Sequence, residues 1–268
     1  MTRIFVRKSL KDLKTFIPDP DDCHYLLQVL RMRQGEEFCV VDAEGTVYNA
    51  VITSVGKKEL EAELISQQDI SHEMKAKITL YQSVSKGERM DLTIQKSVEL
   101  GVTKIVPVLS DRCVVKLDGK SGKSDRWQKI ALEAARQSGR DIVPEVTEPV
   151  KFADAVKNCD EDIKIIPWEE ARDETLKDIL SKTNEGSIAV FIGPEGGFDS
   201  SEADLAIANG IKPVTLGPRI LRTETAGPAV PRRGLLLAES VEITLVFHID
   251  IHHFFSFTSL RRFSSVSS

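Results

Sequence analysis

Residues 188–198 read IAVFIGPEGGF, and this stretch decides the fold. The five apolar residues at 188–192 predict a strand that is buried on both faces, as in a parallel sheet. The loop GPEGGF follows, and Asp199 or Ser200 with Glu202 marks the start of a helix. Glycines in such a loop let its backbone approach a ligand and expose its N–H groups, although a plain strand-to-helix turn is the alternative.

The same alternation of strand and helix extends on both sides of this stretch. Strands are expected at 78–84, 104–109, 163–166 and 213–216, and helices at 90–100, 126–138, 174–182 and 200–209. Strands that alternate with helices of this length predict a parallel sheet covered on both faces. Ligands of such sheets bind beyond the carboxyl ends of the strands, so the loops there are the place to search for a site.

A second loop, LGPRILRTETA at 216–226, leaves the next strand along the chain. It combines two arginines with a carboxylate, which suits an anionic or planar polar substrate. The alternative is a helix-capping sequence with Thr223 as the cap. The two loops together are more specific than either alone.

The first part of the chain has a different pattern and predicts a compact barrel or curled sheet. Strand-like stretches at 38–41 and 46–52 flank a polar turn and predict a hairpin, and 60–65 predicts a further strand. Residues 24–33 predict a short helix that covers one end. The polar stretch 66–77 is the expected domain boundary.

Composition narrows the classes of function. The chain has 268 residues, 41% of them hydrophobic, and a net charge of −5, so affinity for nucleic acid has to come from local basic patches. Its four cysteines form no C-x-x-C pair, which argues against a zinc, redox or disulfide framework. We expect no metal site. Neither an export signal nor an apolar membrane span is recognisable, so a cytoplasmic location is expected.

Basic side chains form a candidate surface for RNA phosphates, with solvated surface charge as the alternative for each. The candidates are Arg3, Arg7, Lys8, Arg31, Arg33, Lys86, Arg112, Arg136 and Arg140.

The two loops resemble the cofactor-binding region of the RsmE family of knotted SPOUT methyltransferases. Supporting stretches are KGERMDLTIQKSVELGV at 86–102, EAARQSGR at 133–140 and HYLLQVLRMRQGEE at 24–37. The resemblance implies a PUA-like β-barrel at 1–72 for RNA binding and a trefoil-knotted α/β methyltransferase domain at 73–226. It further implies a homodimer that transfers a methyl group from S-adenosylmethionine to N3 of a uridine in 16S rRNA of the small ribosomal subunit.

The resemblance also assigns expected roles to individual residues of the two loops. The resemblance implies that the cofactor is bound by Gly193, Pro194, Glu195, Gly196, Gly197, Leu216, Gly217, Pro218, Ile220, Leu221 and Thr223. A uridine N3 carries a proton and becomes nucleophilic as that proton leaves, so an arginine near the carbonyl oxygens would stabilise the developing charge. Arg222 is the candidate. Glu195 and Glu224 are candidate proton acceptors, with carboxylates that satisfy backbone N–H groups as the alternative.

The chain departs from the family pattern after Ala226. Gly227, Pro228 and Pro231 are predicted to break the expected helix, and 227–268 forms an atypical tail rich in histidine and phenylalanine. A shifted reading frame is our hypothesis for this tail, and His248 and His252 in it do not make a convincing metal site. An RNA-binding protein without catalysis is therefore the alternative function. An α/β hydrolase is disfavoured because no G-x-S-x-G elbow is present.

Overall fold

The computed structural model describes residues 2–68, 71, 73–113, 122–168, 171, 179 and 186–238, with side chains to residue 230. The chain divides into a compact unit, Met1–Ala238, and a second unit, Glu239–Ser268, which lies outside the described residues. The predictions for the tail beyond Ala238 therefore lie outside them too, as does nearly all of the helix expected at 174–182.

The N-terminal part of the chain forms a five-stranded sheet. Its strands are β1 (Arg3–Phe5), β2 (Thr15–Phe16), β3 (Glu37–Val41), β4 (Val47–Val55) and β5 (Leu60–Gln67), in the order β1-β3-β4-β5-β2. The antiparallel pair β3–β4, with Phe38 opposite Ala50, confirms the predicted hairpin. Inward-facing residues such as Phe38, Ile52 and Leu60 are fully buried and fill one core.

The helix predicted at 24–33 has different limits in the structure. It consists of α1 (Pro20–His24) and a single π-helical turn, η1 (Tyr25–Val29). It starts earlier because Pro20, with its fixed φ, occupies the first turn. It ends earlier because Arg31 adopts a positive φ of 57°. Leu26 is buried as expected, whereas Val29 and Leu30 are exposed, so the predicted apolar face is only partly correct.

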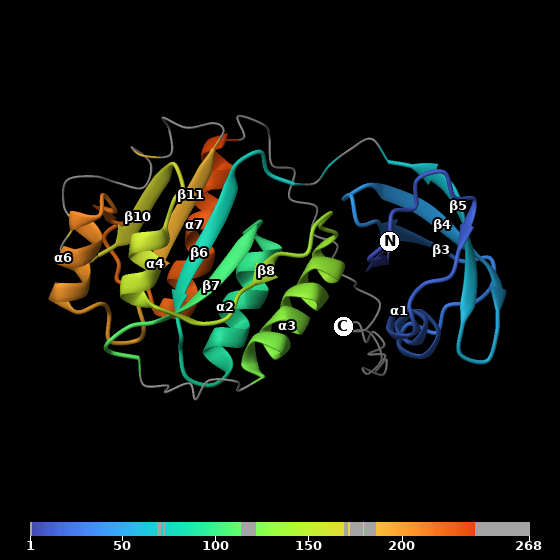
Figure 1. Cartoon of the computed structure of the whole chain (residues 1–268), viewed down its shortest axis with the longest axis horizontal. Helices are drawn as coiled ribbons and strands as arrows, with labels where there is room; N and C mark the ends of the chain where they lie inside the picture. The colour runs from blue at the N-terminus through green and yellow to red at the C-terminus, as the bar shows by residue number, and fades with distance from the viewer. Residues whose placement is uncertain are drawn as a thin grey trace, which may run out of the picture. The chain divides into compact units, whose positions relative to one another are not determined.

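The rest of the described chain is built on a seven-stranded sheet whose recorded pairings are all parallel. The strands are β6 (Lys77–Ser83), β7 (Lys104–Leu109), β8 (Glu145–Val146), β9 (Val150–Lys151), β10 (Ile163–Pro167), β11 (Ser187–Ile192) and β12 (Lys212–Val214). Their order is β12-β10-β11-β6-β7-β8, and β9 also pairs with β7 (Figure 1). The apolar run at 188–192 lies in the middle of this sheet, which confirms the predicted parallel architecture.

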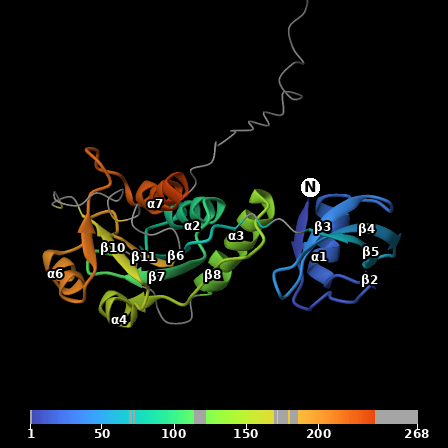
Figure 2. The same ribbon diagram turned by 90° about the horizontal axis from the view of Figure 1, so that it is seen from above.

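Helices cover both faces of the parallel sheet, as Figure 2 shows. One face carries α2 (Glu88–Glu99), α3 (Lys123–Ser138) and α7 (Thr223–Ala238), and the other carries α4 (Phe152–Asn158) and α6 (Ser200–Ala208). Successive residues of β11 alternate between the two cores: Val190 and Ile192 face the first set of helices, and Ala189 and Phe191 the second. None of the helices in the described part of the chain is long and apolar enough to span a membrane.

The prediction that the helix breaks after Ala226 is wrong. Helix α7 continues through Gly227, Pro228 and Pro231 to Ala238. A Cβ at Gly227 would lie 2.9 Å from Oε1 of Gln82, so the glycine lets α7 lie directly on β6. Gly227 also has no Cβ to collide with the ring of Pro228, the clash that normally excludes helix before proline. Tertiary packing of this face thus outweighs the low helix propensity of the Gly-Pro pair.

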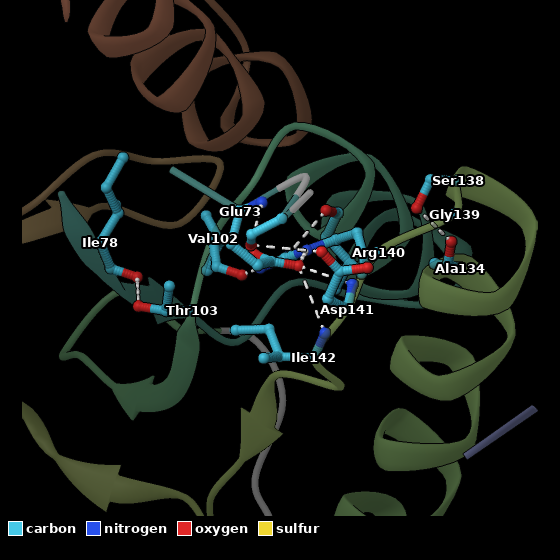
Figure 3. A network of polar contacts seen from close by, with 12 residues as sticks. Glu73, Ile78, Val102, Thr103, Ala134, Ser138, Gly139, Arg140, Asp141 and Ile142 are labelled. Atoms are coloured by element: carbon cyan, nitrogen blue, oxygen red, sulfur yellow. Dashed lines mark hydrogen bonds and ion pairs between the residues drawn. The ribbon is translucent and has the colours of Figure 1, made fainter. Parts of the chain in front are cut away.

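An ion pair joins Glu73, which lies shortly before β6, to the buried side chain of Arg140, which lies just after α3 (Figure 3). Glu73 accepts hydrogen bonds from Arg140 Nη2 at 2.5 Å and from the Asp141 backbone N–H at 2.9 Å. Arg140 also donates to the carbonyls of Val98 and Val102. The two sheets fall on either side of the boundary expected near residue 72. The limits of the domains and the trefoil knot stay predictions.

Candidate functional site

The two loops singled out in the sequence line one cavity of about 750 Å³. One loop joins β11 to α6 and the other joins β12 to α7, and the two strands are separated only by β10. Because all three strands are parallel, their carboxyl ends meet at the same edge of the sheet. The eleven residues implied to bind the cofactor, together with Arg222 and Glu224, all line this cavity. Their individual roles stay predictions.

The first loop is folded tightly on itself. A Cβ at Gly193 would lie 3.2 Å from the Phe198 backbone N, which explains a glycine directly after β11. The Gly197 N–H donates to the Pro194 carbonyl at 3.0 Å and closes the turn. Asp199 then caps α6 in a capping box with Glu202, as the sequence predicts. The loop is therefore a rigid wall of the cavity.

Thr223 ties the two loops together. Its Oγ1 donates to the Gly193 carbonyl at 2.7 Å and accepts from Gln82 Nε2 at 2.9 Å. Thr223 is the first residue of α7 and is buried, so its hydroxyl bonds to the other loop and not to its own helix, contrary to the capping alternative.

Two arginines that also line the cavity bind the first loop. Arg112 donates to the Gly196 carbonyl at 2.9 Å and to Asp199 Oδ2 at 3.0 Å. Arg89 donates to Glu195 Oε1 at 2.8 Å, and the Lys86 backbone N–H donates to the same oxygen at 3.3 Å. Both arginine side chains are about half exposed, with 49% of Arg112 and 48% of Arg89 accessible, so these ion pairs contribute more to geometry than to stability.

The environment of Glu195 bears on its candidate role as a proton acceptor. Partial burial acts to raise the pKa of this carboxyl group, but hydrogen bonds from backbone N–H groups and from Arg89 outweigh it and hold the pKa below its ordinary value. An ionised carboxylate that is already hydrogen-bonded is a weak base. Glu224, half-buried in the first turn of α7, and the exposed Arg222 flank Thr223 at the cavity.

Sequence analysis missed several residues that line the cavity. Pro167 and Trp168 lie at the carboxyl end of β10, where the rule applied to the other two loops would have found them. Arg89 also lines the cavity, and it lies within a stretch that carries the family resemblance. Gln82 does not line the cavity but bonds to Thr223, and it had no sequence signal because a glutamine in a strand is not in itself informative.

Three of the nine candidate RNA-binding residues are buried in ion pairs. Arg3 pairs with Asp141 and also donates to the Gly139 and Arg140 carbonyls. Arg136 pairs with Asp22 at 2.5 Å, and its guanidinium lies 4.4 Å from the centre of the Tyr25 ring. Arg140 is held by Glu73, as Figure 3 shows. Such groups are not free to bind phosphate, because the charge is desolvated and already paired.

The other six candidates are on the surface. Arg7, Lys8, Arg31, Arg33 and Lys86 are exposed, and so is Arg112, whose guanidinium is engaged with the first loop. Within the described ranges, no group of three or more His, Cys, Asp or Glu side chains could hold a metal ion.

The protein has a small β domain followed by a parallel α/β domain with a cavity at the ends of its strands. Comparison with known families identifies the class of protein to which this arrangement belongs. The model of the RNA methyltransferase domain matches residues 72–232, and the model of the RNA methyltransferase PUA domain matches residues 17–65. The first match extends to residue 232, six residues beyond Ala226, and the atypical character of the tail beyond it stays a prediction. The class is an RNA methyltransferase.

Individual relatives define the family. Ribosomal RNA small subunit methyltransferase E of Bacillus subtilis is 31% identical over 237 residues, which cover 84% of this chain and 93% of the relative. The crystal structure of a ribosomal RNA small subunit methyltransferase E from Neisseria gonorrhoeae bound to S-adenosyl methionine is 37% identical, with a TM-score of 0.82 over 88% of this chain and 98% of that one. A Legionella pneumophila putative methyltransferase in complex with SAM is 34% identical, with a TM-score of 0.81 over 88% and 97% of the two chains. The chain belongs to the ribosomal RNA small subunit methyltransferase E family.

Proposed function

We propose that this protein transfers a methyl group from S-adenosylmethionine to N3 of a uridine in 16S rRNA of the small ribosomal subunit. The observation that carries the proposal is the single cavity lined by both loops, which Thr223 joins. Its volume of about 750 Å³ is in the usual range for a cofactor site. Relatives with SAM bound, 34% and 37% identical to this chain, support the same assignment.

The residues that line the cavity fit such a cofactor. Apolar side chains of Ile192, Leu216 and Leu221 offer a dry surface for a planar base, and the glycine-rich turn offers backbone groups for its polar edges. The leucine and glycine residues of the two loops would hold the adenosine and methionine parts between them. When bound, the cofactor supplies an electrophilic methyl group together with its own leaving group.

The protein's contribution is to align the uridine N3 with that methyl group and to exclude water. Arg222, exposed at the cavity, would stabilise the negative charge that spreads onto the uracil carbonyl oxygens as the N3 proton leaves. Glu224 is the better candidate to accept the proton, because the carboxylate of Glu195 is already bonded to Arg89 and its pKa is lowered.

The exposed basic residues would bind the RNA backbone. Arg7, Lys8, Arg31 and Arg33 in the N-terminal part of the chain, with Lys86 beside the first loop, form the proposed phosphate-binding surface. Arg112 would combine RNA binding with support of the loop, and Arg3, Arg136 and Arg140 leave the proposed surface because they are buried in ion pairs. The target uridine would be single-stranded or flipped out of a helix. We further propose a cytoplasmic homodimer.

Calorimetry with S-adenosylmethionine and a methylation assay on 16S rRNA and small subunits test the function. We expect cofactor binding and the appearance of N3-methyluridine, identified by mass spectrometry of the digested RNA. RNA binding without binding of S-adenosylmethionine would instead favour the alternative, an RNA-binding protein without catalysis.

A further inference from the structure

Gln82 is a fully buried amide in the core of the parallel sheet. It lies on β6, on the same face as Leu80, beneath α2 and α7. Its Nε2 donates to the Ser83 carbonyl at 3.1 Å and to Thr223 Oγ1 at 2.9 Å. Its Oε1 is buried, and among the described residues it has no hydrogen-bond partner. Burial of an incompletely satisfied amide costs stability, so the amide does not stabilise the fold as an apolar side chain would.

The direction of the hydrogen bonds makes Gln82 the first donor in a series of two hydrogen bonds. A threonine hydroxyl has one hydrogen to donate. Because Gln82 Nε2 donates to Thr223 Oγ1, that hydroxyl is free to donate its hydrogen to the Gly193 carbonyl, 2.7 Å away. This series of hydrogen bonds therefore connects Gln82 on β6, through Thr223 at the start of α7, to Gly193 at the start of the first loop.

The other side of the amide is fixed by close packing. A Cβ on Gly227 would lie 2.9 Å from Gln82 Oε1, so the Gly227 Cα packs against this oxygen. The oxygen therefore faces Gly227, and the N–H group faces Thr223, which lies about one turn earlier in α7. This contact fixes the orientation of the amide although its oxygen accepts no hydrogen bond among the described residues.

We propose that Gln82 is a positioning residue of the cofactor site: through Thr223 it fixes the first loop relative to the second. This inference rests on the proposed function, because it assumes that the cavity binds S-adenosylmethionine. Thr223 lies between Arg222 and Glu224, both of which line the cavity, so its position also sets the backbone from which these two side chains extend.

Substitutions that keep the shape of the side chains test the chain of hydrogen bonds. Thr223→Val removes the hydroxyl, and Gln82→Met removes the amide at similar volume. Loss of one such hydrogen bond is expected to weaken binding of S-adenosylmethionine about fivefold to tenfold by calorimetry. Gln82→Met is expected to change the melting temperature little, because the unsatisfied oxygen is removed together with the two hydrogen bonds that the amide donates. Thr223→Ser keeps the hydroxyl and is expected to bind as the wild type does.

Thr103→Val is the matched control. Thr103 Oγ1 donates to the Ile78 carbonyl at 2.9 Å, a contact drawn in Figure 3, and neither residue lines the cavity. The control therefore loses the same kind of bond in the same sheet, and its affinity for S-adenosylmethionine is expected to stay unchanged. Equal weakening in Thr103→Val and Thr223→Val would overturn the inference, because general destabilisation would then explain both. Undiminished binding by Thr223→Val would overturn it as well.

Hydrogen exchange of the ligand-free protein separates this inference from the proposed function. We expect amides of 193–198 to exchange about fivefold to tenfold faster in Thr223→Val and Gln82→Met than in the wild type or in Thr103→Val. If the wild type fails to bind S-adenosylmethionine, the proposed function fails while this readout still tests the positioning. If exchange of the loop is unchanged in both variants, the positioning fails whatever the wild type binds.

Discussion

Replacing Gly227 by alanine tests how closely α7 lies on the parallel sheet. The added Cβ would lie 2.9 Å from Gln82 Oε1, 3.1 Å from Thr93 Cγ2 and 3.5 Å from Leu80 Cδ2. Real Cβ atoms essentially never show the first of these separations, so the helix or the amide has to shift. Overpacking of this kind costs about 1–3 kcal/mol, whereas alanine in place of glycine within a helix gains about 0.5–1 kcal/mol. The new Cβ also meets the ring of Pro228, which reduces this gain. We therefore expect Gly227→Ala to lower the free energy of unfolding by about 1–2 kcal/mol.

Urea denaturation followed by circular dichroism measures this loss as a lower midpoint at unchanged slope. Adding Thr93→Ser removes the methyl group that the new Cβ meets, while the serine hydroxyl can keep the bond that Thr93 donates to the Arg89 carbonyl at 2.8 Å. The double variant is therefore expected to recover part of the lost stability. A Gly227→Ala protein more stable than the wild type would refute the reasoning, because helix propensity alone would then decide and α7 could not lie against Gln82.

Three further predictions concern buried ion pairs and the proposed RNA surface. Glu73→Ala leaves a buried guanidinium without its carboxylate and is expected to lower the free energy of unfolding by about 3 kcal/mol; a loss below about 1 kcal/mol in urea denaturation would contradict this. Burial raises the pKa of Asp22 from 3.8 to about 6, although Arg136 acts to lower it. The folded protein therefore favours the protonated carboxyl group, and the resulting contribution to the free energy of unfolding is complete below pH 3.8 and is lost as the pH rises through 6. The free energy of unfolding of the wild type relative to Asp22→Asn, measured from pH 4 to pH 7, should therefore fall with rising pH, and a rise would be inconsistent with the burial of this carboxyl group. Charge reversal at Arg31 and Arg33 is expected to weaken RNA binding, measured by filter retention, by at least about tenfold while affinity for S-adenosylmethionine is unchanged, and equal loss of both would argue against a separate RNA surface.

The parallel sheet and the location of the cavity could be predicted from sequence because their signals are local. The apolar run at 188–192 allows few structures other than a strand buried on both faces, and β11 is that strand. The loops at 193–198 and 216–226 each follow a strand, and parallel strands bring their carboxyl ends together whatever the intervening sequence. Their shared cavity follows from these two facts.

Features that depend on tertiary contacts could not be predicted in the same way. Gly227 and Pro228 have low helix propensity, and only the close approach to β6 explains why α7 continues through them. The charges of Arg136 and Arg140 are visible in the sequence, but the carboxylates that pair with them, those of Asp22 and Glu73, are distant along the chain. A sequence pattern reports the charge of a side chain and not its partner, which is why these arginines were expected at an RNA surface.

A crystal structure of the full chain with S-adenosylmethionine tests the central claim most directly. We expect the cofactor in the cavity at the ends of β11 and β12, in contact with both 193–197 and 216–221. A cofactor bound elsewhere on the protein, or held by one of the two loops alone, would contradict the account.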